Sequence, residues 1–199
     1  MRKVIVSNIA SLDGYYEGPG QDVMVLNMDE AFDAYNLERI RAASTVLLGR
    51  KSYEGFSSYW PGIADAPDDP ENRALSEDNR KLSQIYNGLE KVVVSDTYAP
   101  PNDNAWHDTT TVVRREDLVG WLEEARTVDA GDILIFGSRT LWNGMLEEGL
   151  VDELHLMISP AALAGGTPII GAPAGLTLLD ARRFEHSQNV LLIYAGARG

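Results

Sequence analysis

Short apolar runs that each end in a glycine or a serine recur through the middle of this sequence. STVLLG (44–49), KVVVS (91–95) and DILIFG (132–137) are short and bounded by a small residue, so they predict buried strands rather than helices. Helices are expected after them, over residues 50–58, 70–86, 115–128 and 138–149. Strands that alternate with helices favour a largely parallel sheet with right-handed crossovers.

The two ends of the sequence complete this pattern differently. Residues 2–10 predict a first strand, and Asp29 can cap a helix that reaches about residue 43. Near the C-terminus, 153–160, 176–185 and 189–196 are strand-like runs without intervening helices. The last two are joined by the short turn HSQ, so they predict an antiparallel hairpin. We therefore expect one mixed α/β domain over the 199 residues.

Composition excludes several classes of function. The formal net charge of −13 argues against a nucleic-acid-binding protein, which needs clustered cations against the phosphate backbone. The sequence has no cysteine, so it offers no disulfide, no thiolate metal ligand and no cysteine nucleophile. No apolar stretch approaches the roughly 20 residues that span a bilayer, and no signal peptide is evident. We expect a cytoplasmic protein that binds no membrane, no nucleic acid and no metal.

The strand ends are candidates for binding phosphate groups. In an open α/β sheet, ligands bind outside the carboxyl ends of the strands, where helix N-termini offer unpaired N–H groups. Gly49 is followed by Arg50, Lys51 and Ser52, and a second turn holds Gly137–Ser138. Glycine and serine are also common in ordinary strand-to-helix turns, so the spacing alone leaves both interpretations open.

The same residues carry a resemblance to a known family. LLGRKSYE (47–54), KVVVSDT (91–97) and DILIFGSRTLWNGMLEEGLVDELHLMISPAALAGGTPII (132–170) resemble the dihydrofolate reductase superfamily, as does the opening RKVIVSNIASLDGYYEGP (2–19). The most similar branch is that of the reductase domain of bacterial riboflavin biosynthesis. The resemblance covers nearly the whole chain and implies a three-layer α/β fold. Its sheet would be mixed and mostly parallel, with a C-terminal antiparallel hairpin.

This resemblance implies NADPH as the cofactor and names the residues that would bind it. The implied cofactor-binding residues are Ile9, Ala10, Gly49, Arg50, Lys51, Ser52, Ser95, Gly137, Ser138, Arg139, Thr140 and Leu141. Ile9 and Ala10 match the strand end along the nicotinamide, and Ser95 matches the strand end near the adenosine 2′-phosphate. One position departs from the family pattern: many relatives have a basic residue after that serine, where this chain has Asp96. An acid there would repel a 2′-phosphate.

Two acidic residues are candidates for the catalytic group. Asp33 precedes Arg50 by 17 residues (50 − 33), a spacing similar to that of the substrate-binding carboxylate in folate reductases. Asp13 lies in the SLDG turn, which the resemblance places beside the nicotinamide. Each has a structural alternative, because Asp33 suits the first turn of a helix and Asp13 suits a turn. Tyr16 and Trp60 are further candidates for binding the substrate.

These residues favour an NADPH-dependent reductase that acts on a small heterocyclic substrate. The resemblance points to 5-amino-6-(5-phosphoribosylamino)uracil, the riboflavin-pathway intermediate, with dihydrofolate as an alternative. A zinc deaminase signature, which accompanies many such reductases, is absent from the sequence. A different class of function is a non-catalytic nucleotide-binding module. We also expect a homodimer formed through the C-terminal half, because a terminal antiparallel ribbon leaves a sheet edge to be paired. In the alternative, loop 161–175 folds back and covers that edge.

Overall fold

The computed structural model describes residues 1–196 and divides into two compact units. Unit 1 comprises Met1–Arg2 and Ala34–Ser138, and unit 2 comprises Lys3–Asp33 and Arg139–Gly199. The last three residues of the predicted domain, 197–199, lie outside the described part. Helix α1 (Glu30–Ala42) begins in unit 2 and continues into unit 1. That both units form one domain stays a prediction.

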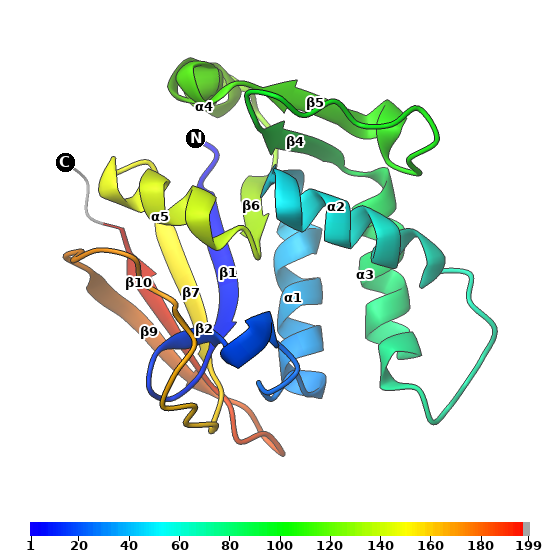
Figure 1. Ribbon diagram of the computed structural model, residues 1–199, viewed down its shortest axis with the longest axis vertical. Helices are drawn as coiled ribbons and strands as arrows, with labels where there is room; N and C mark the ends of the chain where they lie inside the picture. Colours follow the sequence, from blue (N-terminus) through cyan, green and yellow to red (C-terminus); the bar gives the residue numbers. More distant parts are fainter. Residues whose placement is uncertain (197–199) are drawn as a thin grey trace. The chain divides into compact units, whose positions relative to one another are not determined.

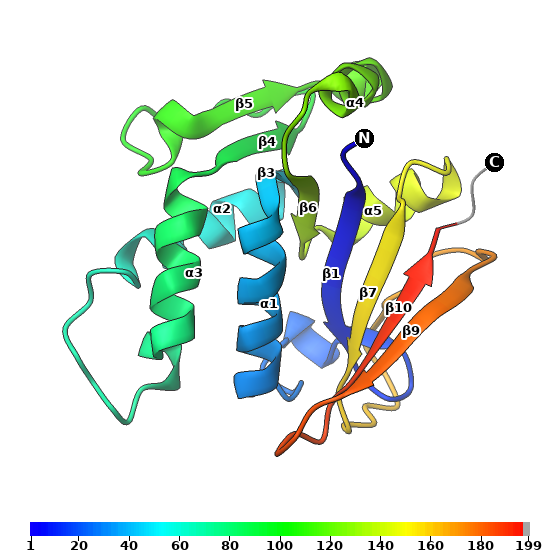
Figure 2. The ribbon, with the colours of Figure 1, turned by 180° about the vertical axis from the view of Figure 1, so that it is seen from behind.

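Unit 1 has four parallel strands in the order β5-β4-β3-β6. Strands β4, β5 and β6 and the helices of this unit are labelled in Figure 1, and β3 is labelled in Figure 2. The strands are β3 (Ala43–Gly49), β4 (Glu90–Val94), β5 (Thr110–Val113) and β6 (Asp132–Phe136). The helices are α2 (Arg50–Tyr59), α3 (Glu77–Gly88) and α4 (Leu118–Thr127). The alternation of strand and helix predicted for this part of the chain is confirmed.

Unit 2 contains the C-terminal strands, which lie side by side in Figure 2. Strand β7 (Glu153–Ile158) pairs in parallel with β1 (Val4–Ala10), and β10 (Val190–Ala195) runs antiparallel to both β7 and β9 (Thr177–Arg183). The predicted antiparallel hairpin is therefore confirmed. Helix α5 (Arg139–Glu147) completes the elements predicted for this half.

Two features differ from the sequence-based prediction. Helix α3 begins at Glu77 rather than near residue 70, because the Ser76 hydroxyl accepts a hydrogen bond from Asn79 N and ends the preceding loop with an N-cap. The loops around 15–17 and 167–168 were not expected to pair. They form a small antiparallel sheet of β2 (Tyr15–Glu17) and β8 (Thr167–Pro168).

The strands of each unit contribute buried apolar residues to that unit. Val4, Val46, Val92, Ile133 and Leu154 are all fully buried. Strand β9 is the exception, since every one of its seven residues is exposed. Loop 161–175 packs through β8 against β2, so it does not cover β9. Within residues 1–196, no helix has the length and apolar character to cross a membrane.

Candidate functional site

The carboxyl ends of the unit 1 strands bring to one edge those predicted phosphate-binding residues that belong to this unit. All four strands run in the same direction, and Gly49 at the end of β3 pairs in register with Val94 at the end of β4. The turns after β3, β4, β5 and β6 therefore lie at a single edge of the unit 1 sheet. This arrangement is the one in which α/β proteins bind their ligands.

Two serines connect the turn after β3 to the turn after β6. Gly49 N donates to Ser138 Oγ at 3.1 Å, and Ser138 N donates to Ser52 Oγ at 2.8 Å. We refer to these three residues as the serine clasp. Each serine oxygen accepts an N–H and keeps its own O–H to donate, because a hydroxyl is both donor and acceptor. The clasp therefore fixes the two turns together and leaves two hydroxyl donors at this edge.

The second turn of the clasp has unusual backbone geometry. Gly137 and Ser138 are consecutive residues with positive φ, at 55° and 50°. A serine in this left-handed region costs about 1 kcal/mol or more. Such strain persists only where surrounding contacts hold it, and it concentrates at ligand sites. The clasp supplies those contacts through the Ser138 amide and hydroxyl.

Helix α2 presents an N-terminus suited to an anion. Its N-cap is Gly49, which has no side chain to cap the N–H groups of the first turn. Arg50 and Lys51 are exposed in that first turn, and no acid lies there. The Arg50 guanidinium lies 5.3 Å from the ring centre of Tyr98 and its Nε lies 3.0 Å from Glu54. Amide groups, cations and hydroxyls together fit a phosphate-bearing cofactor.

Ser95 and Asp96 follow β4 at the same edge. Ser95 is 8% exposed, and its Oγ accepts a hydrogen bond from Tyr98 N at 3.2 Å. The Asp96 carboxylate accepts from Arg115 N at 3.0 Å, and its Oδ2 lies 3.6 Å from Arg115 Nε. Arg115 was not predicted from the sequence. The parallel pairing of β4 with β5 was the signal that could have found it, because residues that follow paired strand ends are neighbours.

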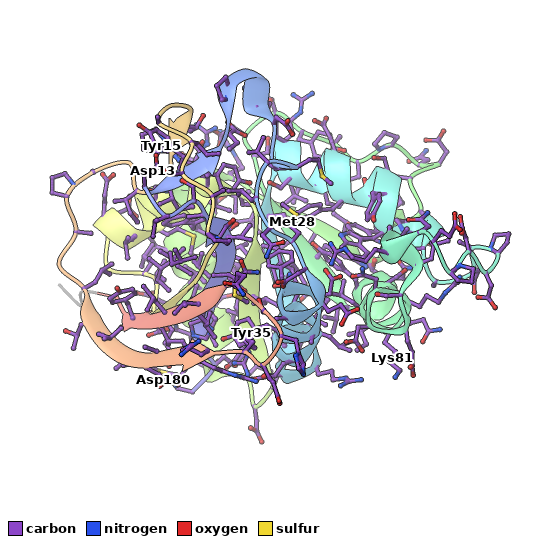
Figure 3. All side chains as sticks on the ribbon, turned by 90° about the horizontal axis from the view of Figure 1, so that it is seen from below. Asp13, Tyr15, Met28, Tyr35, Lys81 and Asp180 are labelled. Carbon is purple, nitrogen blue, oxygen red and sulfur yellow. The ribbon has the colours of Figure 1, made fainter. Side chains whose placement is uncertain are left out.

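In unit 2, Asp13 holds the backbone of another loop. Its carboxylate accepts hydrogen bonds from Ser11 Oγ at 2.6 Å, Leu163 N at 3.0 Å and Ala164 N at 2.7 Å. These bonds, that of Ser11 foremost, lower the pKa of Asp13 to about 2. Figure 3 shows Asp13 beside Tyr15, at the entry to β2. A carboxylate with this pKa carries no proton near neutral pH, so these contacts favour a loop-fixing role for Asp13.

The start of α5 is also tied to the loop that follows β7. Arg139 Nε donates to Pro168 O, and Asn143 Oδ1 accepts from Gly171 N at 2.6 Å. Asn143 also donates from Nδ2 to Ile169 O at 3.1 Å. Arg139 therefore has a structural partner in addition to its predicted phosphate role. Asn143 was not predicted from the sequence.

The remaining predicted residues occupy several positions. Ile9 and Ala10 are buried and end β1, whereas Thr140 is exposed and Leu141 half-buried in the first turn of α5. Tyr16 lies in β2, where burial, together with the negative charge of Glu17, raises the pKa of its hydroxyl.

Asp33 and Trp60 were the other candidates for the substrate. Asp33 is only 7% exposed, in the first turn of α1, and its amide donates to Asp29 O at 3.1 Å. Trp60, in unit 1, is half-buried at the end of α2 and packs edge-on against Tyr59 at 5.0 Å between ring centres.

Unit 2 has an open pocket of about 550 Å³ beside the end of β7. Its lining residues are Val25, Leu26, Asn27, Ser159, Pro160, Ala161 and Gln188. Asn27 N donates to Ser159 Oγ at 3.0 Å, which fixes loop 22–29 against the end of this strand. None of the residues predicted to bind substrate lines this pocket. No group of three or more His, Asp or Glu side chains in residues 1–196 is placed to hold a metal ion.

Comparison with known proteins agrees with this architecture. The family model described as the RibD C-terminal domain matches residues 2–193. The uncharacterized protein YyaP of Bacillus subtilis (strain 168) is 24% identical over 198 residues, which cover 97% of this chain and 94% of that protein.

Two solved structures share the fold. A putative riboflavin biosynthesis protein from Shewanella sp. PV-4 superposes with a TM-score of 0.66 at 19% identity, covering 98% of this chain and 99% of the other. The second is a diaminohydroxyphosphoribosylaminopyrimidine deaminase/5-amino-6-(5-phosphoribosylamino)uracil reductase from Thermotoga maritima. It superposes with a TM-score of 0.65 at 13% identity, covering 98% of this chain and 57% of the other. The predicted α/β fold of the dihydrofolate reductase type is thereby confirmed.

Proposed function

The chain belongs to the RibD C-terminal domain family, and from that premise we propose that it is an NADPH-dependent reductase of a small heterocyclic substrate. The substrate we propose first is 5-amino-6-(5-phosphoribosylamino)uracil or a close analogue, on which the Thermotoga maritima relative is said to act. The observation that carries the proposal is the serine clasp beside the uncapped N-terminus of α2. A site built from amide groups, hydroxyls and two cations suits the phosphates of a dinucleotide.

The donor set of unit 1 assigns roles to its residues. Arg50 and Lys51 would neutralise phosphate charge, and Ser52 and Ser138 would donate their hydroxyl protons to phosphate oxygens. Ser95 would contribute a further hydroxyl near the adenosine. The cofactor, when bound, supplies a hydride to the substrate. Ile9 and Ala10 of unit 2 stay predicted as the residues along the nicotinamide.

Asp33 is the better candidate for the acid. It is only 7% exposed, in the first turn of α1, and its spacing from Arg50 is similar to that of the substrate-binding carboxylate in folate reductases. Asp13, by contrast, is exposed, and its three hydrogen bonds lower its pKa to about 2. We therefore propose that Asp33 holds or positions a proton for the substrate and that Asp13 orders loop 163–164 next to β2.

Oxidation of NADPH against a panel of substrates tests this function. The panel contains the phosphoribosylaminopyrimidine, dihydrofolate and a quinone, each measured with NADPH and with NADH. We expect turnover with the pyrimidine, a loss of kcat in Asp33→Asn of about a hundredfold or more, and a smaller loss in Asp13→Asn. Turnover of dihydrofolate alone would replace the proposed substrate with a pterin.

The panel also separates the enzyme from a binding module. A protein that binds NADPH but turns over no member of the panel would support the non-catalytic alternative. A protein that binds neither nucleotide would contradict the proposed function altogether. Nucleotide binding measured by titration calorimetry therefore accompanies the activity assay.

A further inference from the structure

Asp96, at the carboxyl edge of unit 1, carries a charge that argues against NADPH. It directly follows Ser95, and an isolated negative charge there would repel a 2′-phosphate. The structure gives this carboxylate two contacts with Arg115. Asp96 Oδ1 accepts a hydrogen bond from Arg115 N at 3.0 Å, and Asp96 Oδ2 lies 3.6 Å from Arg115 Nε.

Strand pairing brings the two residues together. Val94 and Val113 are partners in the parallel register of β4 and β5, and each ends its strand. Asp96 is the second residue after Val94, and Arg115 is the second residue after Val113. The sheet therefore holds the backbones of Asp96 and Arg115 close together, so their contact does not depend on a flexible side chain alone. Arg115 lies at the same edge as Ser95, whose amide donates to Val113 O at 3.0 Å.

The other arginines at this edge have closer acidic partners. Arg50 Nε lies 3.0 Å from Glu54, and Arg114 NH1 lies 2.8 Å from Glu116. The contact of Arg115 with Asp96 is longer, and the side chain of Arg115 is 78% exposed, so the ends of its guanidinium face solvent. A planar guanidinium offers paired N–H donors that match phosphate oxygens.

We propose that Arg115, positioned by Asp96, provides the cation that recognises the 2′-phosphate of NADPH in this chain. Asp96 is then a positioning residue, and the cation that many relatives carry next to the serine comes from the neighbouring strand end. The inference rests on the proposed function, because it concerns the affinity for the cofactor named there. The charge of Asp96 alone predicts weaker binding of NADPH, whereas the positioning role predicts that Asp96 strengthens it.

Dissociation constants for NADPH and NADH, measured by titration calorimetry without substrate, test the inference. In Arg115→Gln, we expect NADPH to bind roughly ten- to hundredfold more weakly, as for the loss of a charge-assisted hydrogen bond, with NADH unchanged. Asp96→Asn should also weaken NADPH, because the neutral amide holds Arg115 less well. Arg114→Gln, which removes a charge from the adjacent residue, is the matched control and should leave both constants unchanged.

The outcomes distinguish a failure of this inference from a failure of the proposed function. If Asp96→Asn tightens NADPH, Asp96 acts as a repulsive charge and the positioning role is wrong. If Arg115→Gln leaves the NADPH constant unchanged, or weakens NADPH and NADH equally, Arg115 does not recognise the 2′-phosphate, while the proposed reductase stands. If the parent protein binds neither nucleotide, both the proposed function and this inference are refuted.

Discussion

Removal of the Ser138 hydroxyl tests whether the serine clasp orders the proposed cofactor site. In Ser138→Ala, Gly49 N loses its acceptor at 3.1 Å, while the Ser138 N–H bond to Ser52 can persist. Serine and alanine both carry a Cβ, so the cost of the left-handed backbone at φ 50° is the same in both. The variant therefore isolates the contribution of the Ser138 hydroxyl to stability and to NADPH binding.

The expected destabilisation follows from the burial of the groups concerned. A neutral hydrogen bond contributes about 1 kcal/mol net, and an unpaired buried N–H costs about 1–3 kcal/mol. Gly49 is half-buried, so water can partly satisfy its N–H group, and we expect a loss of about 1–2 kcal/mol in the free energy of unfolding. If NADPH binds only the form in which the two turns are joined, and the variant destabilises that form by the same free energy, NADPH should bind about five- to thirtyfold more weakly.

Urea unfolding and calorimetric titration with NADPH measure the two effects on the same variants. Ser138→Gly removes the same hydroxyl and relieves the left-handed strain, so it should be more stable than Ser138→Ala by about 0.5–1 kcal/mol. The double variant Ser52→Ala/Ser138→Ala should lose less than the sum of the single losses, since both bonds join the same turns. Ser58→Ala is a control on α2, because the exposed Ser58 hydroxyl donates to Gly55 O within the same helix.

An unfolding free energy for Ser138→Ala within about 0.3 kcal/mol of the parent, with an unchanged NADPH constant, would refute the clasp as an ordering device. Equal stability of Ser138→Ala and Ser138→Gly would show that the positive φ of this residue carries no strain.

Three further predictions concern charge, burial and assembly. Arg50→Ala/Lys51→Ala should remove most of the increase in melting temperature that NADPH produces, and equal shifts in variant and parent would exclude this turn from phosphate binding. Burial lowers the pKa of Lys91 from an ordinary 10.5 to about 8, so the unfolded state binds more protons between these values and stability should rise with pH there. In urea unfolding, the parent should gain up to about 3 kcal/mol over this window relative to Lys91→Met, and parallel pH profiles would contradict the lowered pKa. We expect a homodimer paired through the exposed strand β9, in which Asp180 can face Arg182 of the second copy, so Asp180→Lys should favour the monomer. A single parent species near 21.8 kDa in sedimentation would refute the dimer.

The local pattern of the sequence was enough to predict most elements. The run 44–49 became β3, which ends at the same Gly49, and 132–137 became β6, which ends one residue earlier at Phe136. Buried strands carry a strong local signal because apolar side chains must be excluded from water along their whole length. The start of α3 was misplaced because its cap, Ser76, lies within a polar segment where several residues could begin a helix.

The sequence also predicted which residues could bind phosphate, since glycine, serine and cations at strand ends are a local signal. It did not determine how they are connected. Ser52 and Ser138 are 86 residues apart, and Asp96 and Arg115 are 19 apart. Only the pairing of parallel strands brought these partners within hydrogen-bonding distance.

Tertiary structure also decided the environment of individual charges. Lys91, in a strand predicted correctly, is fully buried, and its ammonium lies 4.7 Å from the Trp106 ring centre. Arg2, part of a basic start in the sequence, is buried and donates to Thr45 Oγ1 at 2.6 Å and Gly131 O at 2.8 Å. Sequence periodicity records which side of an element faces the core. The sign and strength of an electrostatic effect depend on the distance and the solvent between two groups, and both are set only when remote segments pack together.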